Sequence, residues 1–301
     1  MAIPRIATYP MPAAASFPAN RVDWKVDPSR AALLIHDMQQ YFIDFYDASA
    51  APIPQLVANA QRLRDACDAA GIPVYYTAQP PVQPAEDRAL LNEFWGPGLP
   101  AKPEGAPIIA ALAPRAPHTV LDKWRYSAFV RSDLLERLQA QGRNQLIVCG
   151  VYAHIGCQVT CVDAFMRDIQ PVMVGDALAD FSADWHVKAL EYVAQRAGVV
   201  RSTAQVLTDL GVALPDELPA DMHALHAEVA KMLEMPKSDL GLDDNLLYAG
   251  LDSIRLMSLL ERWKRAGANL SFVQLAEHPT VAQWWALLVG SNVESRVAET
   301  V

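Results

Sequence analysis

The chain has 301 residues, of which 52% are hydrophobic and 20% are charged. This composition is typical of a globular protein and excludes disorder throughout the chain. The net charge of −9 argues against a nucleic-acid-binding protein, because contacts to phosphates need a basic surface. At roughly 150 residues per domain, this length favours two domains.

Targeting segments and metal sites are not expected from this sequence. Four prolines interrupt the apolar stretches of the first twenty residues, and no apolar run is long enough to span a membrane. The four cysteines lack the spacing of disulfide pairs, which favours the reducing cytoplasm. Cys157, Cys161 and His154 lack a fourth nearby ligand, so we interpret them as packed side chains and expect no metal.

Short apolar segments alternate with helical patterns between residues 31 and 207. The strand segments are Ala31–Ile35, Ile72–Gln79, Thr119–Trp124, Gln145–Ala153, Pro171–Gly175 and, more weakly, Val199–Ser202. The helical segments are Ile53–Ala70, Ser132–Gln141, Cys157–Asp168 and Asp184–Ala197. Continuously apolar strands are required where a parallel sheet is covered on both faces. The sequence therefore predicts a three-layer, Rossmann-like α/β domain over residues 1–211.

Polar side chains follow four of these strands at the point where each strand ends. Asp37, Gln79, Lys123 and the segment Tyr152–Gly156 occupy these positions. In open parallel sheets the reactive groups gather beyond the carboxyl ends of the strands. We therefore expect these side chains to share one site.

The C-terminal part has a different character, because it carries −6 of the net charge, with 7 basic against 13 acidic residues after Val212. Residues 212–221 contain two prolines among acidic and small residues, which suits a linker. Helical spacing over Asp221–Met235, from Ser253 onward and over Val281–Leu288 predicts a small all-α bundle at 222–290. Residues 291–301 are predicted to be a flexible tail.

The segment Gly250–Ile254, with the sequence GLDSI, resembles the phosphopantetheine attachment motif of acyl, aryl and peptidyl carrier proteins. A serine at a helix N-terminus presents its hydroxyl to solvent, and the positive helix end tolerates a phosphodiester. The resemblance implies a covalent 4'-phosphopantetheine on Ser253; the simpler alternative is an ordinary N-cap at Asp252 or Ser253. It also places Met257, Phe272 and Ala276 on the face that meets partner enzymes, although helix packing alone would also explain them.

The N-terminal part contains five motifs that resemble those of the isochorismatases. They are HDMQ at 36–39, YYTAQP at 75–80, WGPG at 95–98, KWRYSAF at 123–129 and GVYAHIGC at 150–157. Joined to a carrier domain, the chain resembles the bifunctional isochorismatase/aryl carrier proteins of catecholate siderophore assembly, of the enterobactin type. This resemblance implies hydrolysis of the vinyl ether of isochorismate to pyruvate and 2,3-dihydro-2,3-dihydroxybenzoate.

The wider superfamily includes cysteine hydrolases built on an Asp-Lys-Cys triad, and the resemblance places Gly156 at their nucleophile position. Isochorismatases carry glycine there, since protonation of carbon and attack by water need no thiol. Cys157 is one residue further on, and one residue turns a helical side chain by about 100°, so we expect it to be packed in the core. If Gly156 makes room for substrate or water, a side chain there should impair catalysis.

The resemblance also implies roles for the other site residues. Asp37 is the candidate general acid, since an apolar strand end favours the protonated carboxyl. Lys123 would either pair with Asp37 or bind a substrate carboxylate, and the sequence leaves both open. The planar fork of Arg88 suits a substrate carboxylate. Gln79, Tyr126 and Tyr152 are expected to orient the substrate by hydrogen bonds. Phe42 and Trp95 are expected to form aromatic walls of the pocket.

The expected partners are isochorismate, a phosphopantetheinyl transferase, a 2,3-dihydroxybenzoate-activating ligase and a nonribosomal peptide synthetase condensation domain. No nucleic acid or membrane partner is expected, and homo-oligomers are left open. Two rival functions remain: an amidohydrolase that uses Cys157, and a carrier protein whose α/β domain is an inactive scaffold.

Overall fold

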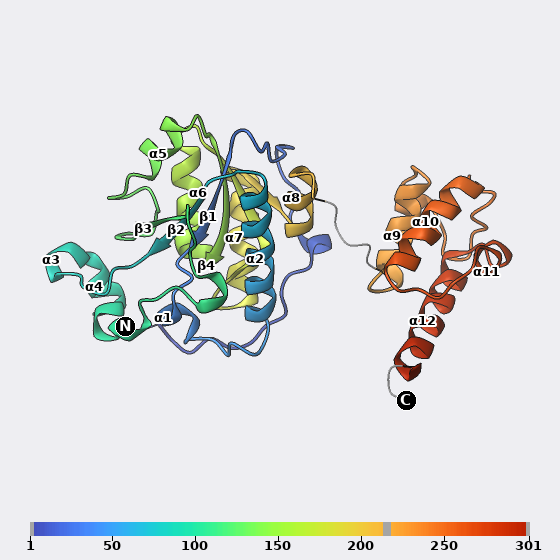
Figure 1. The fold of residues 1–301 in the computed structure, drawn as a ribbon, viewed down its shortest axis with the longest axis horizontal. Helices are drawn as coiled ribbons and strands as arrows, with labels where there is room; N and C mark the ends of the chain where they lie inside the picture. Colours follow the sequence, from blue (N-terminus) through green and yellow to red (C-terminus); the bar gives the residue numbers. More distant parts are fainter. Residues whose placement is uncertain (1–2, 213–217, 299–301) are drawn as a thin grey trace. The chain divides into compact units, whose positions relative to one another are not determined.

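The N-terminal part of the chain folds around one six-stranded sheet. In a computed structural model, which describes residues 3–212 and 218–298 (side chains to residue 290), every strand pairing is parallel and the order is β3-β2-β1-β4-β5-β6 (Figure 1). The strands are β1 (Ala31–His36), β2 (Val74–Ala78), β3 (Thr119–Asp122), β4 (Gln145–Val151), β5 (Gln170–Ala179) and β6 (Val199–Arg201). All six predicted strands are present.

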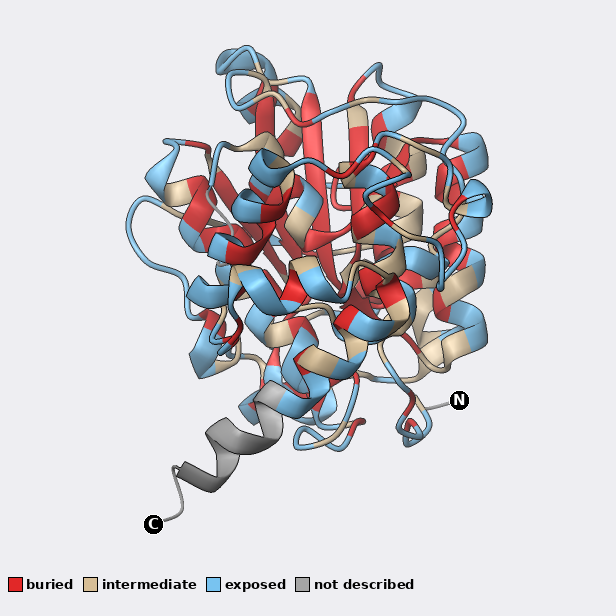
Figure 2. Ribbon diagram, turned by 90° about the vertical axis from the view of Figure 1, so that its right-hand side faces the viewer, coloured by how far each residue is buried: buried red, intermediate tan, exposed pale blue. Residues whose placement is uncertain are grey.

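Helices cover both faces of this sheet, as predicted. One face is covered by α2 (Ile53–Ala69) and α8 (Thr203–Asp209), and the other by α5 (Leu134–Ala140), α6 (Gln158–Phe165) and α7 (Ala183–Arg196). Alternate residues of β1 enter the two cores, with Leu33 and Ile35 on the α2 side and Ala32 and Leu34 on the other. Figure 2 shows these buried strands between partly exposed helices. The domain is therefore three-layer α/β.

Short elements that the sequence patterns do not predict fill the connections. They are α1 (Gln40–Ile43), α3 (Ala85–Arg88), α4 (Leu90–Trp95), the π-helical turn η5 (Ala153–Cys157) and the 3-10 turns Ala14–Ser16, Leu99–Ala101, Pro103–Gly105 and Ala110–Leu112. The elements between β2 and β3 include α3 and α4, which carry Arg88 and Trp95. These helices are too short for the apolar spacing of a helix to recur along the sequence, so the hydrophobic pattern does not predict them.

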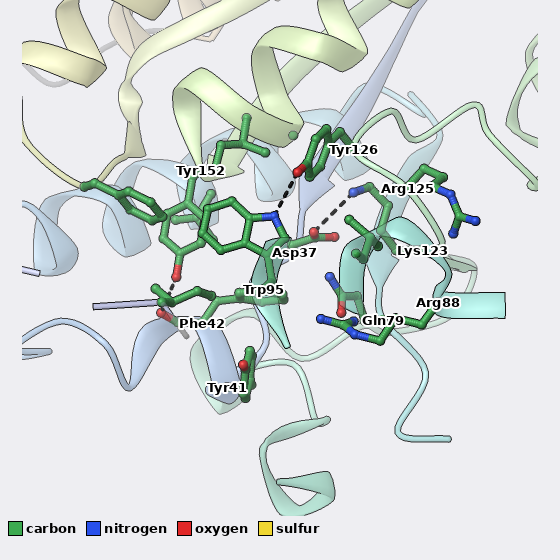
Figure 3. Close-up of a pocket in the computed structure, with 16 residues that line it drawn as sticks. Asp37, Tyr41, Phe42, Gln79, Arg88, Trp95, Lys123, Arg125, Tyr126 and Tyr152 are labelled. Atoms are coloured by element: carbon green, nitrogen blue, oxygen red, sulfur yellow. Dashed lines mark hydrogen bonds and ion pairs between the residues drawn. The ribbon is translucent and has the colours of Figure 1, made fainter. Parts of the chain in front are cut away.

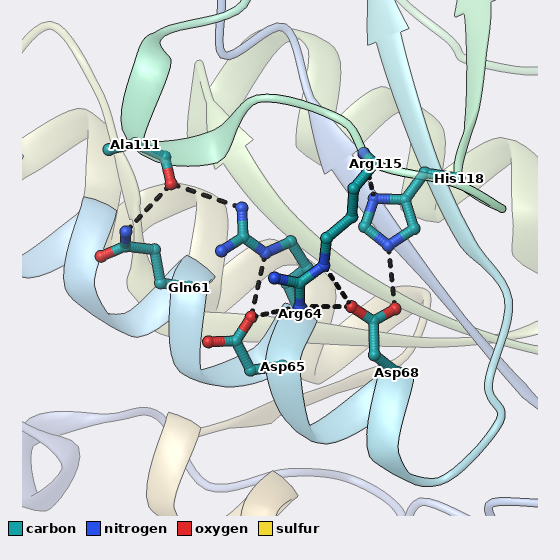
Figure 4. Close-up of polar contacts among 7 residues, drawn as sticks. All are labelled: Gln61, Arg64, Asp65, Asp68, Ala111, Arg115 and His118. Atoms are coloured by element: carbon teal, nitrogen blue, oxygen red, sulfur yellow. Dashed lines mark hydrogen bonds and ion pairs between the residues drawn. The ribbon is translucent and has the colours of Figure 1, made fainter.

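A polar cluster holds the loop before β3 against α2 (Figure 4). Arg115 contacts the carboxylates of Asp65 and Asp68, and His118 Nε2 lies 2.8 Å from Asp68 Oδ1. Exposed ion pairs of this kind contribute little stability singly, but several together can fix a segment. The cluster anchors the beginning of β3, and Lys123 follows the end of the same strand.

The C-terminal part is a separate helical unit, and packing divides the chain into Met1–Ala213 and Leu214–Val301. Its helices are α9 (Met222–Met232), the 3-10 turn Lys237–Asp239, α10 (Ser253–Arg265), α11 (Phe272–Glu277) and α12 (Val281–Ala298). The core contains Trp263 and Trp284 in edge-to-face contact at 5.9 Å. No described helix is both long and apolar enough to cross a membrane.

The last helix, α12, continues to Ala298 and so includes most of the segment 291–301, whose flexibility stays a prediction. Residues 291–298 contain no proline or glycine that would end a helix. Residues 299–301, and residues 213–217 of the predicted linker, lie outside the described residues.

Candidate active site and carrier serine

The chain changes direction across the sheet between β1 and β4, and this creates the position for a site. From β1 the chain continues outward to β2 and β3, whereas β4 lies on the other side of β1 and continues to β5 and β6. A crevice forms at such a switch point, beyond the carboxyl ends of the strands. Asp37 directly follows β1, Tyr152 follows β4 and Lys123 follows β3, so all three face this crevice (Figure 3).

The crevice contains a cavity with about 580 Å³ of empty space, part of which is open to solvent. All nine site residues proposed for this domain line it, namely Asp37, Phe42, Gln79, Arg88, Trp95, Lys123, Tyr126, Tyr152 and Gly156. Further lining residues are Ile3, Tyr41, Leu91, Arg125, Val151, Ile155 and Phe181. The structure therefore brings the predicted residues together, although from five separate segments of the chain.

Asp37 is buried and tightly held. Its side chain has an exposed fraction of 8%, and its backbone φ of 48° lies in the left-handed region, which is uncommon for aspartate. The hydroxyl of Thr77 donates to Asp37 Oδ1 at 2.5 Å, and Lys123 Nζ lies 3.4 Å from Oδ2. The sequence leaves two roles open for Lys123, an ion pair with Asp37 or a contact to a substrate carboxylate. The structure shows the ion pair with Asp37, and Lys123 also lines the cavity.

Arg88 places a second buried cation in the cavity wall. Its guanidinium donates to the Gly96 carbonyl at 2.8 Å and to Gln83 Oε1 at 3.1 Å, and no carboxylate pairs with it within the described parts of the chain. A side chain at Gly98 would overlap the guanidinium, so this glycine permits the close approach. Burial lowers the pKa of Arg88 from its usual value, with Tyr41 opposing the change. An unpaired buried cation of this kind fits an anionic ligand.

The aromatic and amide residues are held by hydrogen bonds of their own. Trp95 Nε1 donates to the Tyr126 hydroxyl at 2.8 Å, which leaves the Tyr126 proton free to donate elsewhere. The Tyr152 hydroxyl donates to the Phe42 carbonyl at 3.2 Å, so its proton is already used. Burial raises the pKa of Tyr152 well above its usual value. Of the two tyrosines, Tyr126 is the one with a proton available to a ligand.

Three residues that support the site were given no role by the sequence analysis. The Gln39 side chain binds both backbone groups of Gln79, accepting from its N–H at 2.7 Å and donating to its carbonyl at 2.9 Å. Phe181 packs against Tyr152 at 4.7 Å between ring centres. Thr77 holds Asp37, as described above. Phe181 was missed because the predicted strand ended at Gly175, whereas β5 continues to Ala179 and brings Phe181 to the edge that carries Asp37 and Tyr152.

Gly156 lies in the π-helical turn η5, where the Cys157 N–H bonds to the Tyr152 carbonyl. A Cβ added at Gly156 would lie 2.1 Å from Cε1 of His36. We expected the missing side chain to leave room for substrate or water, and this reason is wrong: the fully buried His36 imidazole occupies that space. The ring is fixed by a hydrogen bond of 2.8 Å from Nδ1 to the Val151 carbonyl.

Cys157 is packed in the core, as predicted. It is fully buried, and burial raises the pKa of its thiol well above the usual value, which opposes formation of the thiolate nucleophile. Cys161 is likewise buried, and His154 pairs with Asp180 at 2.5 Å rather than with a sulfur. Among the described residues, no group of three or more potential metal ligands comes together.

The predicted carrier serine is exposed at the beginning of α10. Asp252 is the N-cap, and its carboxylate accepts from the Arg255 N–H at 2.8 Å. Since Asp252 caps the helix, the Ser253 hydroxyl is not needed for that purpose. Met257 is half exposed on the same helix, and Phe272 and Ala276 are partly exposed on α11. Open surroundings at Ser253 fit a long covalent arm.

Comparison with known proteins gives matches to both parts of the chain. Residues 31–205 match the isochorismatase domain family, and residues 223–288 match the phosphopantetheine attachment site family. Enterobactin synthase component B of Escherichia coli is 50% identical over 288 residues, covering 96% of this chain and 98% of that protein. Isochorismatase of Bacillus subtilis is 48% identical over 303 residues, covering 96% of each chain.

A solved structure is also similar to the N-terminal unit. The cysteine hydrolase from Pseudomonas syringae pv. phaseolicola matches with a TM-score of 0.56 and 26% identity, covering 65% of this chain and 98% of that one. The α/β fold is thus shared with an enzyme named for cysteine chemistry, while the cavity of this chain has Gly156 and no cysteine on its wall.

Proposed function

Since this chain belongs to the isochorismatase family and is an isochorismatase joined to a phosphopantetheine carrier domain, we propose that both parts serve the assembly of a catecholate siderophore. The N-terminal unit cleaves isochorismate with water to give pyruvate and 2,3-dihydro-2,3-dihydroxybenzoate. After a separate enzyme has oxidised this product, the carrier holds the resulting 2,3-dihydroxybenzoate as a thioester. The four cysteines are free, as suits the reducing cytoplasm where we place these reactions.

The balance of charges in the cavity is the observation that carries this proposal. Isochorismate has two carboxylates, and the cavity wall presents three cations, the buried Lys123 and Arg88 and the half-buried Arg125, against one carboxyl group, Asp37. Arg88 has no acidic partner among the described residues, so a substrate carboxylate would supply one. The aromatic side chains of Phe42, Trp95 and Tyr152 give the ring an apolar wall.

The position of Asp37 suits proton delivery to carbon. In the proposed reaction the electron pair of the enol-ether double bond takes the proton of Asp37, which leaves a carboxylate and an oxocarbenium ion. Water adds to that carbon and forms a hemiketal. The bond between the hemiketal carbon and the ring oxygen then breaks as the hemiketal hydroxyl loses its proton, so that pyruvate leaves and the ring oxygen gains a proton as the alcohol. One water is consumed, and Asp37 regains a proton from it.

Substrate binding would itself help Asp37 to act as an acid. In the free protein, Lys123 Nζ is 3.4 Å from Asp37 Oδ2. Two substrate carboxylates bring negative charge into the cavity and compete for Lys123. Lys123 is then shared between Asp37 and the substrate, which weakens its contact with the acid.

The carrier unit provides an accessible hydroxyl at Ser253, which we propose a phosphopantetheinyl transferase modifies. When attached, the arm supplies a thiol that carries the aryl group as a thioester. Met257, Phe272 and Ala276 would then meet the activating ligase and a synthetase condensation domain, because their exposed surface lies on the helix of Ser253 and on α11.

One sample tests both parts. Purified protein is incubated with isochorismate, and pyruvate release is followed. The same protein is treated with coenzyme A, a phosphopantetheinyl transferase and then the activating ligase with 2,3-dihydroxybenzoate, and its intact mass is measured. We expect pyruvate in step with isochorismate loss and two successive mass increases. Absence of pyruvate would contradict the hydrolase assignment, and absence of the second increase would contradict the aryl cargo.

A further inference from the structure

The side chain that fixes Asp37 lies in the middle of the sheet and outside the cavity. Thr77 belongs to β2, pairs in register with His36 of β1, and has an exposed fraction of 1%. It does not line the cavity, so it cannot touch a bound substrate. Its hydroxyl nevertheless makes two contacts with the candidate acid: it donates to Asp37 Oδ1 at 2.5 Å and accepts from the Asp37 N–H at 3.0 Å.

These two contacts determine which carboxyl oxygen can carry a proton. A hydroxyl has one proton, and Asp37 Oδ1 is the only acceptor for it among the hydrogen bonds of the described residues. Oδ1 therefore acts as an acceptor in both states of the carboxyl group. When Asp37 is protonated, its proton must lie on Oδ2, the oxygen that Lys123 approaches at 3.4 Å.

The same hydroxyl also holds the backbone. Asp37 has a φ of 48°, a conformation that aspartate adopts at a cost and that neighbouring contacts must maintain. The N–H of Asp37 is satisfied by the Thr77 oxygen at 3.0 Å. One buried hydroxyl thus fixes both the main chain and the carboxyl orientation at this position.

We propose that Thr77 is a positioning residue that keeps the transferable proton on Oδ2 of Asp37, a role that rests on the vinyl-ether hydrolysis proposed above. The other titratable or charged groups that act on Asp37 are His36 on β1, Lys123 after β3, and Tyr152 and Cys157 after β4. Thr77 differs from them in being unable to change its own charge.

Two substitutions separate the hydroxyl from the shape of the side chain. Thr77→Val keeps the branched shape and removes the hydroxyl, whereas Thr77→Ser keeps the hydroxyl and removes a methyl group. We expect Thr77→Val to lower kcat at least roughly tenfold with KM within about threefold, and Thr77→Ser to stay within about threefold of the wild type. Equal losses in both variants, or a kcat unchanged in Thr77→Val, would overturn the proposal.

The pH profile supplies a readout that a purely structural role would not change. Activity falls at high pH when the acid loses its proton, and removal of a donor to the carboxylate favours the protonated form. The alkaline limb of kcat should therefore move to higher pH in Thr77→Val, although its plateau is lower. A limb at the wild-type position would contradict the assigned hydrogen bond.

A measurement without substrate keeps this inference separate from the proposed function. In protein labelled with ¹³C at the aspartate carboxyls, the Asp37 signal is identified by its loss in Asp37→Asn. Its titration midpoint should lie higher in Thr77→Val than in the wild type and in Thr77→Ser. If wild-type protein released no pyruvate, the proposed function would fail, while equal midpoints in the three proteins would overturn the role of Thr77.

Discussion

The two reactive oxygens of this chain lie in opposite environments. The Asp37 carboxyl is buried beyond a parallel sheet and held by Thr77 and Lys123, whereas the Ser253 hydroxyl is exposed at the beginning of a helix. Protonation of carbon needs a dry, oriented acid. A carrier serine must instead enter the active site of another enzyme. Substitutions in the N-terminal unit should therefore change activity by disturbing the position of the Asp37 carboxyl. A substitution at Ser253 should abolish modification because the hydroxyl oxygen is missing.

The largest effect is expected for Ser253→Ala. This variant lacks the only hydroxyl of the attachment motif, so it should take up no phosphopantetheine at all. Isochorismate hydrolysis should remain within about twofold of the wild type, because the two sites belong to separate units and sites without shared partners usually behave independently. Intact mass and pyruvate release measure the two activities. Ser258→Ala, at another exposed serine of α10, is the matched control and should be modified normally.

Asp37→Asn should lower turnover by at least about a hundredfold, the lower end for general acid–base catalysis. The variant should remain folded by circular dichroism and should still accept the arm and the aryl group. Asp122→Asn removes an exposed carboxylate next to Lys123 and should leave turnover nearly unchanged. If Asp37→Asn kept near-normal turnover, Asp37 would have no part in the mechanism.

Gly156→Ala tests how closely the His36 ring packs against Gly156. The added methyl meets the His36 ring, and overpacking of this kind costs about 1–3 kcal/mol of unfolding free energy. Turnover should fall as well, whereas Cys157→Ala should keep turnover within about twofold because the thiol lies off the cavity. Denaturant unfolding and pyruvate release are the measurements.

A double variant identifies the cause. In His36→Ala/Gly156→Ala the ring is absent, so the cost of Gly156→Ala should be largely relieved. Strictly additive losses of unfolding free energy would show that the ring is not what the methyl group meets. The reverse catalytic ranking, with Cys157→Ala the more damaging single variant, would revive the thiol hydrolase.

The last prediction concerns acid stability, which should also differ between the units. Burial lowers the pKa of His36 to about 4, whereas an unfolded histidine titrates near 6.5. The stabilising contribution of the neutral ring is therefore complete above about pH 6.5 and is lost as pH falls toward 4, amounting to at most roughly 3 kcal/mol.

His36→Asn should reduce this loss, because the amide can still donate to Val151 but does not titrate. Urea unfolding of the N-terminal unit at about pH 7 and about pH 4.5 measures it. His226→Asn, at a partly exposed position in the carrier unit, is the control and should leave the N-terminal transition unchanged. An equal pH slope in wild type and His36→Asn would contradict the buried neutral ring.

The sequence predicts the sheet well, for a physical reason. A parallel strand covered on both faces must be apolar throughout, so β1 and β4 stand out from the surrounding chain. Seven of the nine predicted cavity residues could be named because they stand at strand ends or in motifs of a known family, whereas Phe42 and Arg88 were named only from the wider resemblance. The continuation of α12 through residues 291–298 was not predicted, because these residues lack an apolar pattern.

The residues around Asp37 could not be assigned roles in the same way. Thr77 and His36 lie inside apolar strands, where a single polar residue gives no periodic signal. Their functions depend on the register of β1 against β2 and on the turn that places Gly156 over the ring. Such contacts join residues that are far apart in sequence, and they become visible only when the strands are paired.

The contact between His36 and Gly156 also constrains how this protein can evolve. A mutation that introduces cysteine at position 156 alone meets a ring that Val151 holds in place. A mutation that first shortens the side chain at position 36 leaves a cavity, which lowers stability but keeps the fold. A lineage moving between ether hydrolysis and thiol chemistry on this scaffold therefore faces an ordered path, in which position 36 changes before position 156.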